Sequence, residues 1–238
     1  MRILAVLSRI PFPLTDGGAI LSYNTLKHLH QAGHEVHILA LNTKKHHQTP
    51  DVLRDVASHI ETIEIDTDIR ATGALQSLLR RESYIAGRFQ SPRFAELLRK
   101  ALQSSPFDIV HLDHTLTGWY AAIVQEEKSR RSAAPKVVLR THNVEYKIQE
   151  RLANHETTAL RKWYRNHEAE RMKAAEQRIF RDCDGVIAIT PEDAAEIRLM
   201  GYNGALEVIP AGVDVQEFAR KPDIVPRTNT LCYIGGMD

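Results

Sequence analysis

The chain has 238 residues, of which 43% are hydrophobic and 26% charged, and its 31 basic and 30 acidic residues leave a net charge of +1. This composition is typical of a globular protein with a core of ordinary size, and the balanced charge gives no sign of nucleic-acid binding. Two cysteines are too few for a disulfide framework or a zinc site, and no apolar run approaches the roughly 18–20 residues that span a bilayer.

The chain alternates between apolar strands and helical patterns. Residues 2–7 are a continuous apolar run, which we interpret as a first core strand because no signal-peptide cleavage site follows. Further strands are predicted over residues 35–41, 60–65, 107–113, 136–142 and 185–190, and residues 206–214 close the series. Helices are predicted over residues 18–32, 73–80, 92–103 and 156–181, and from Pro191 onward. This rhythm predicts an α/β fold with a doubly wound parallel sheet.

The long helix predicted over residues 156–181 is amphipathic in pattern. Leu160, Trp163, Met172, Ala175 and Ile179 recur near one stripe, which we expect to face the core. In a doubly wound sheet, ligands bind outside the carboxyl ends of the strands, near the point where the strand order reverses. The residues that follow each strand are therefore the candidates for a site.

The first candidate is the turn Asp16, Gly17 and Gly18, which leads into the first helix. Paired glycines let the backbone approach a ligand closely, and a helix N-terminus favours an anion. The spacing is not G-x-G-x-x-G, so the dinucleotide-binding fingerprint is absent. A tight turn without a ligand remains the alternative.

The second candidate is the end of the fourth strand, where Asp113 and His114 are expected to point into the crevice. A histidine there can bond a sugar hydroxyl, accept a proton or simply pack. His111 lies inside the strand and is assigned to the core.

The third candidate follows the fifth strand, where Arg140, His142, Asn143 and Glu145 form a dense polar cluster. A capped turn, with Asn143 bonding local backbone, is the structural alternative. The segment "KKHH" at residues 44–47 is interpreted as a solvated loop, and the basic helix faces as solvated surfaces. The sequence contains no G-x-S-x-G, P-loop or H-E-x-x-H motif.

Residues 220–229, "RKPDIVPRTN", have the prolines, charges and low apolar content of a linker. The next residues, 230–238, begin with a short apolar run and a Gly-Gly pair, as a buried strand and turn would. We expect this strand to begin a second domain that the chain lacks, and residues 1–219 to form the domain before it. An edge strand of the same sheet is the alternative.

The order of these segments resembles the N-terminal half of GT-B glycosyltransferases, specifically the large retaining group called family 4. The resemblance rests on phrases that follow one another over some 215 residues: "MRILAVLSRIPFP", "DGGA", "LKHLHQAGHEVHILAL", "FDIVHLDH", "VVLRTHNVEY", "DCDGVIAITPEDAAEI" and "VIPAGVDVQEF". "LCYIGGMD" is similar to the first strand of the family's second Rossmann-like domain.

The resemblance implies an acceptor-side domain of a nucleotide-sugar-dependent enzyme that acts on a glycan, lipid or small-molecule acceptor. Gly17 and Gly18 match a glycine loop near the donor phosphates, and His142, Asn143 and Glu145 match a loop that often faces the acceptor. Asp113 and His114 match a position where the family often has a histidine touching the donor sugar, but His114 is displaced by one residue. Retaining enzymes of this kind need no protein nucleophile, so no catalytic residue is assigned.

The resemblance also implies that the nucleotide-sugar donor is held mainly by the missing half. The present half would bind no cofactor and no metal, and it would be inactive alone. Polysaccharide synthesis in the cytoplasm is the commonest setting of the family, and the basic helix faces leave open a peripheral contact with the inner membrane. The alternatives are half of a GT-B-like sugar-nucleotide epimerase, or a binding module without catalysis.

Overall fold

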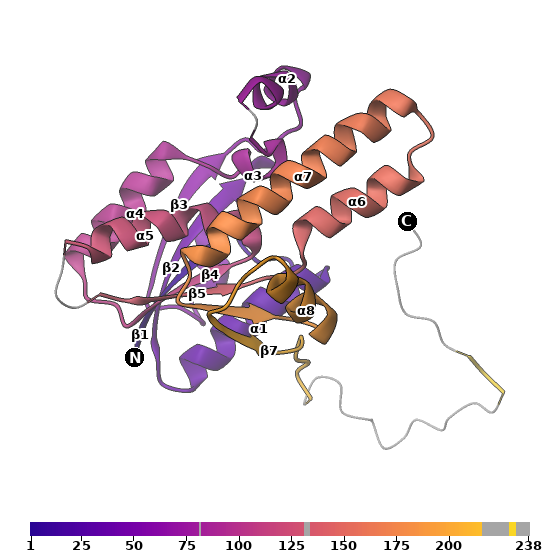
Figure 1. The fold of residues 1–238 in the computed structure, drawn as a ribbon. Coiled ribbons are helices and arrows are strands. Elements are labelled where there is room, and N and C mark those ends of the chain that lie inside the picture. The colour runs from indigo at the N-terminus through magenta and orange to yellow at the C-terminus, as the bar shows by residue number, and fades with distance from the viewer. Residues whose placement is uncertain (81, 131–133, 216–228, 232–238) are drawn as a thin grey trace.

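The computed structural model describes residues 1–80, 82–130, 134–215 and 229–231. Within these residues the chain forms a single seven-stranded parallel sheet flanked by helices (Figure 1), which confirms the predicted doubly wound, Rossmann-like α/β architecture. The strands are β1 (Arg2–Leu7), β2 (Glu35–Thr43), β3 (His59–Ile65), β4 (Ile109–Asp113), β5 (Lys136–Arg140), β6 (Gly185–Ala188) and β7 (Ala205–Val208). The helices are α1 (Gly17–Gln31), α2 (Ala71–Arg80), α3 (Tyr84–Gly87), α4 (Pro92–Ser104), α5 (Ala121–Lys128), α6 (Glu145–His155), α7 (Ala159–Arg181) and α8 (Pro191–Leu199), with short 3-10 segments η1 (Lys44–His46), η2 (Pro50–Leu53) and η3 (Thr115–Tyr120).

The strand order of the sheet is β3-β2-β1-β4-β5-β6-β7. The chain therefore builds the sheet outward from β1 in one direction and then returns to β4 on the other side of β1. Leu7 at the end of β1 is in register with Asp113 at the end of β4. The switch point of the sheet lies between the carboxyl ends of these two strands, which is where such folds bind ligands.

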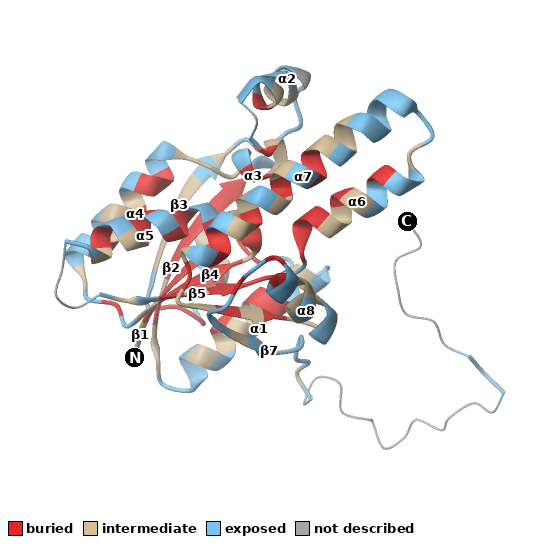
Figure 2. Ribbon diagram, viewed as in Figure 1, coloured by how far each residue is buried: buried red, intermediate tan, exposed pale blue. Residues whose placement is uncertain are grey.

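The alternation of side chains along β1 divides the core between the two faces of the sheet. Ala5 and Leu7 pack with Leu26 of α1 in one cluster. Leu4 and Val6 belong to a larger cluster that includes side chains of α4, α5, α7 and α8. Figure 2 shows the inner strands as mostly buried ribbon, as expected for a parallel sheet covered on both faces, whereas the edge strands β3 and β7 contain no buried residue.

Helices α6 and α7 form an antiparallel hairpin that extends beyond the sheet (Figure 1). The sequence pattern predicted α7 but not α6. It was also wrong about the N-terminal part of the apolar stripe, because Leu160 is 72% exposed and Trp163 49% exposed, whereas Met172 and Ile179 are buried. Figure 2 shows the outer part of the hairpin as mostly exposed ribbon, since only α6 lies beside α7 there.

Two buried glutamates of α7 hold the first turns of two shorter helices. Glu168 accepts the backbone N–H groups of Tyr84 (3.2 Å) and Ile85 (3.0 Å) in α3. Glu176 accepts those of Glu145 (2.8 Å) and Tyr146 (3.0 Å) in α6. The first N–H groups of a helix have no partner within the helix, so the carboxyl oxygens of a glutamate from another helix satisfy them and fix where that helix begins.

The differences from the predicted elements are small elsewhere. β4 begins at Ile109 and β5 ends at Arg140, each inside its predicted range. The final strand, predicted over residues 206–214, ends at Val208, and α3 and α5 were not predicted. The predicted linker at 220–229 and the strand expected over 230–238 lie almost wholly outside the described residues. None of the helices within the described ranges combines the length and the hydropathy of a membrane-spanning segment.

Candidate functional site

A polar cleft of about 590 Å³ opens at the switch point of the sheet. It lies between the N-terminus of α1 and the turns that follow β1, β4 and β5. Of the predicted site residues, seven line it: Asp16, Gly17, Gly18, Asp113, His114, His142 and Asn143. Residues from three separate parts of the sequence thus meet in one place.

The N-terminus of α1 forms one wall of the cleft. Asp16 is the N-cap and accepts the backbone N–H of Ala19 at 3.0 Å, and its carboxylate also forms an ion pair with Arg9. Burial alone would raise the pKa of Asp16, but the bonds from Arg9 and Ala19 outweigh it and leave that pKa below its usual value. A Cβ added to Gly18 would lie 3.4 Å from Arg9 Nη2 and 3.5 Å from His142 Nδ1, whereas one added to Gly17 would meet nothing within 4 Å.

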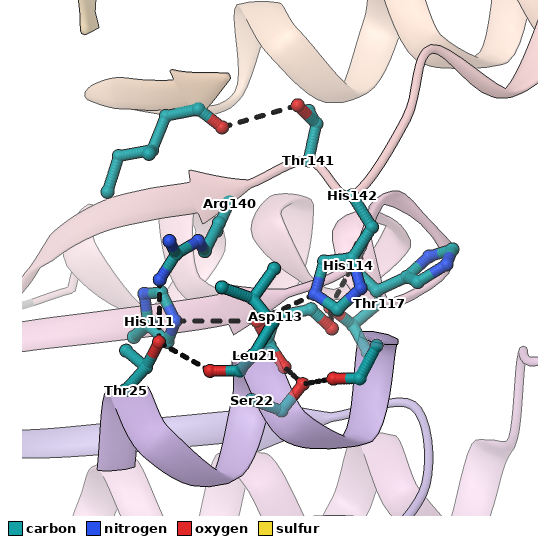
Figure 3. A network of polar contacts seen from close by, with 12 residues as sticks. Leu21, Ser22, Thr25, His111, Asp113, His114, Thr117, Arg140, Thr141 and His142 are labelled. Carbon is teal, nitrogen blue, oxygen red and sulfur yellow. Dashed lines mark hydrogen bonds and ion pairs between the residues drawn. The ribbon is translucent and has the colours of Figure 1, made fainter. Parts of the chain in front are cut away.

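Asp113 is the buried centre of the site. Its Oδ1 lies 3.1 Å from His142 Nε2 and 3.7 Å from His111 Nε2, and its Oδ2 accepts a short hydrogen bond from the hydroxyl of Ser22 (Figure 3). Burial favours the neutral acid, but the two histidines that face it lower the pKa of Asp113 well below its usual range. An ionised carboxylate can only accept hydrogen bonds, so His142 carries its proton on Nε2. Its Nδ1 is then directed toward Gly18 and the cleft.

His114 has an unusual backbone, with φ at 84°. This conformation of His114 turns the chain from β4 into η3. The Nδ1 of His114 accepts a hydrogen bond from the backbone N–H of Leu116 at 3.2 Å. A non-glycine residue in such a conformation costs about 1–3 kcal/mol and is most often found at functional sites. Burial, with the nearby charge of His142, lowers the pKa of His114 to about 3, so its ring is neutral at physiological pH.

Two predicted site residues lie behind the cleft and do not line it. Arg140 is buried, donates to Thr25 Oγ1 at 2.6 Å, and has an Nε without a hydrogen-bond partner; burial lowers its pKa. Glu145 is the first residue of α6, and its carboxylate lies 3.7 Å from His114 Nε2. Burial raises the pKa of Glu145 to about 7.

The cleft also contains residues that sequence reasoning did not select. Arg9 comes two residues after β1, with its Nη1 3.4 Å from His46 Nδ1. The predicted solvated loop at 44–47 holds for the exposed Lys44 and His47, but Lys45 and His46 line the cleft. Burial lowers the pKa of His46, and the charge of Arg9 lowers it further.

His111 was assigned to the core, and it is indeed buried, but it faces Asp113 and belongs to the polar network. Ser22, one helical turn after Gly18, was not considered at all. Its hydroxyl lies 2.9 Å from the Gly18 carbonyl and contacts Asp113 as well. The signal in the sequence was the spacing of four residues between Gly18 and Ser22, which places both residues on the same face of α1.

The cleft offers two kinds of recognition. The N-terminal end of a helix carries partial positive charge, which the cations Arg9, Lys45 and Arg88 reinforce, so this wall suits an anion. The opposite wall presents His142, His114 and Asn143, which suit hydroxyl groups. Among the described residues, no cluster of three or more His, Cys, Asp or Glu is arranged to hold a metal ion.

A doubly wound sheet with a polar cleft at its switch point defines a Rossmann-like ligand-binding domain. The model of Glycosyltransferase Family 4 matches residues 15–217, and the chain belongs to that family. Its architecture is that of a GT-B glycosyltransferase domain, as the ordered phrases in the sequence predicted.

The chain is similar to several solved structures at low sequence identity. The N-terminal domain of trehalose-6-phosphate phosphatase from Candida albicans is similar with a TM-score of 0.51 and 12% identity, over 91% of this chain and 49% of that chain. Sucrose-phosphate synthase from Thermosynechococcus elongatus has a TM-score of 0.46 and 17% identity, over 91% and 92% of the two chains. The lipopolysaccharide outer core galactosyltransferase WaaB has a TM-score of 0.48 and 13% identity, over 90% of this chain and 47% of that chain.

This chain therefore spans about half the length of two of these three structures. At such identities the likeness concerns the fold alone. A comparison with curated proteins found no match.

Proposed function

We propose that this domain is the acceptor-side half of a retaining, nucleotide-sugar-dependent glycosyltransferase that transfers a sugar to a glycan, a lipid or a small molecule. One observation carries the proposal. In a family 4 fold, a helix N-terminus with two glycines and a carboxylate-held imidazole face each other across one switch-point cleft. Sugar transfer needs both features, because the leaving diphosphate is an anion and the groups to be positioned on the sugar and the acceptor are hydroxyls.

The anion wall handles the departing diphosphate in this proposal. Gly18 has no side chain to cover the first turn of α1, where a Cβ would already lie 3.2–3.5 Å from Asp16, Arg9 and His142, so the backbone there stays open to a phosphate in the cleft. Charge develops on the leaving oxygen as the bond to the sugar breaks. Fixed N–H dipoles and cations stabilise that charge without rearranging, which is the largest contribution that an enzyme usually makes.

The histidine wall positions the substrate hydroxyls. The Nδ1 of His142 is a hydrogen-bond acceptor in the neutral ring, and Asp113 holds that ring in place from behind. The leaving phosphate helps to deprotonate the acceptor, so no residue of this domain serves as nucleophile. Arg140 and Glu145 act as positioning residues because they lie behind the cleft surface.

The proposed enzyme divides its work between two domains. In this proposal residues 1–219 are the acceptor side, and the donor-binding domain follows the linker that the sequence predicts at 220–229, beginning with the strand expected from the sequence over 230–238. The nucleotide sugar binds mainly to the second domain, so this half binds no cofactor or metal and is inactive alone. The proposed setting is polysaccharide synthesis in the cytoplasm.

Calorimetry tests this division. UDP, GDP and their common sugar conjugates are titrated into this chain, and then into the same chain joined to a family 4 donor-binding domain. We expect one of these ligands to bind the joined protein and none to bind this chain in the micromolar range. Micromolar binding by the chain alone would contradict the division between domains, and no binding by either protein would contradict the function.

A further inference from the structure

A second pocket lies on the other side of η3 from the cleft, between η3, α3 and α7. Its volume is about 190 Å³, somewhat above the ~150 Å³ that accommodates a benzene ring in an engineered protein cavity. Leu116 lines both the pocket and the cleft. The pocket is therefore a neighbour of the cleft, and among the described residues Leu116 is the one lining residue that the two share.

The pocket contains two polar atoms that have no protein partner. Thr115 is 1% exposed and Arg171 is half-buried, and neither Thr115 Oγ1 nor Arg171 Nη1 has a hydrogen-bond partner within the described residues. A buried hydroxyl or guanidinium nitrogen without a partner costs roughly 1–3 kcal/mol or more. Both atoms are closed to solvent, so a ligand reaches them through a small movement of the surrounding side chains, and bonding both would remove that cost.

The remaining walls are largely apolar. Ala86, Leu116, Trp119 and Ile179 line the pocket, and Trp119 is 48% exposed at its edge. Gly118 closes one side tightly, because a Cβ there would lie 2.3 Å from Ile179 Cγ2. Such walls suit a flat apolar body about the size of one ring.

The charges around the pocket favour a negative group at Arg171. Arg171 and Arg178 are seven residues apart on α7, so they lie on one face, roughly 10 Å apart along the helix axis. Glu82 and Asp182 also line the pocket, but within the described residues no carboxylate oxygen comes within 4.0 Å of either arginine. Both cations are thus available to a ligand.

We propose that this pocket binds a small amphiphilic anion, whose ring-sized apolar body lies against Trp119 and Leu116 and whose carboxylate or phosphate bonds Arg171 and Thr115. This site is separate from the proposed sugar-transfer cleft, and its occupancy does not depend on the reaction. A ligand there would touch η3, the segment that follows His114.

Phenyl phosphate is the probe, since it combines one ring with one phosphate. Trp119 and Trp163 are the only tryptophans in the sequence, so a Trp163→Phe background leaves Trp119 as the single fluorescent reporter. We expect a saturable fluorescence change with a Kd on the order of 1 mM, and binding of inorganic phosphate at least about tenfold weaker. Arg171→Met should weaken phenyl phosphate at least about tenfold.

Two further variants distinguish loss of the binding site from unfolding of the protein. Ala175→Leu fills the pocket while keeping Arg171, and it should also weaken binding at least about tenfold. Arg161→Met, on the exposed outer part of α7, should bind as the background does. Thermal unfolding followed by circular dichroism verifies that each variant is folded. No saturable change, or equal affinity in the Arg171→Met and Arg161→Met proteins, would overturn the proposal.

Discussion

His142 Nε2 lies 3.1 Å from Asp113 Oδ1, and this contact determines which nitrogen of His142 faces the cleft. Asp113 is itself held by Ser22 and approached by His111, so it cannot turn away from the imidazole. In the neutral ring, the Nδ1 of His142 is then the nitrogen without a proton, and it is directed toward Gly18. The hydroxyl-binding property that we assign to the cleft depends on this arrangement.

The tautomer of His142 is the first prediction. Nitrogen-15 NMR of the imidazole rings should show that the neutral form of His142 carries its proton on Nε2 and not on Nδ1. In Asp113→Ala the ring loses its partner and both tautomers should appear, while unfolding free energy falls by about 1–3 kcal/mol because buried donors lose their acceptor. Ser22→Ala is the matched control and should keep the Nε2–H form. A predominant Nδ1–H form in the wild type would contradict the assignment.

The two glycines at the start of α1 should respond differently to the same substitution. Gly17→Ala adds a methyl group into open space and should leave stability unchanged or raise it by about 0.5–1 kcal/mol. Gly18→Ala places its methyl group against Asp16, Arg9 and His142 and should shift the NMR signals of His142. Denaturant unfolding and NMR measure the two effects. If Gly17→Ala moves the His142 signals as far as Gly18→Ala does, the cleft geometry is wrong.

Stability should depend on pH through Glu145. Burial raises the pKa of Glu145 from 4.5 to about 7, so between these values the folded chain binds more protons than the unfolded chain. Glu145 therefore makes the free energy of unfolding fall as pH rises from 4.5 to 7, by at most about 3.4 kcal/mol at about 1.36 kcal/mol per pKa unit. The Glu145→Gln side chain does not titrate in this range, so this variant should lack the contribution of Glu145 to the pH dependence of unfolding. Urea unfolding at several pH values tests it, and equal pH slopes in both proteins would refute it.

The buried glutamates of α7 should matter far more than an exposed one. Glu168→Ala and Glu176→Ala each leave two helix N–H groups without an acceptor and should lower the unfolding free energy by roughly 2–4 kcal/mol. Glu170→Ala, on the exposed face of the same helix, should change it by less than about 0.5 kcal/mol. Chemical denaturation measures all three, and three equal losses would show that the capping contacts contribute little.

The sheet could be predicted because its information is local. Each buried parallel strand is a continuous apolar run, and the glycines and caps between runs mark the helices, as Thr190 does for α8. The rule that ligands bind at the strand ends then selected Asp113, His114 and His142 without any knowledge of distances.

The remaining features depend on long-range contacts. Helix α6 begins inside the polar cluster after β5 because Glu176, 31 residues further on, supplies the acceptors for its first turn. Leu160 fits the apolar stripe of α7 but is exposed, because α7 extends past the sheet. His111 has the pattern of a core residue, and only the approach of Asp113 makes it part of the site.

The central claim is best tested by sugar transfer itself. A protein that joins this domain to a family 4 donor-binding domain is incubated with UDP- and GDP-sugars and a panel of glycan, lipid and small-molecule acceptors, and release of the nucleoside diphosphate is measured. We expect acceptor-dependent release that His142→Ala lowers at least about tenfold in kcat/KM, whereas Arg161→Met, on the exposed outer part of α7, changes it less than about twofold. Release that is equally fast in the wild type and in His142→Ala would contradict the role of the Asp113–His142 pair, and no release with any donor would contradict the proposed function.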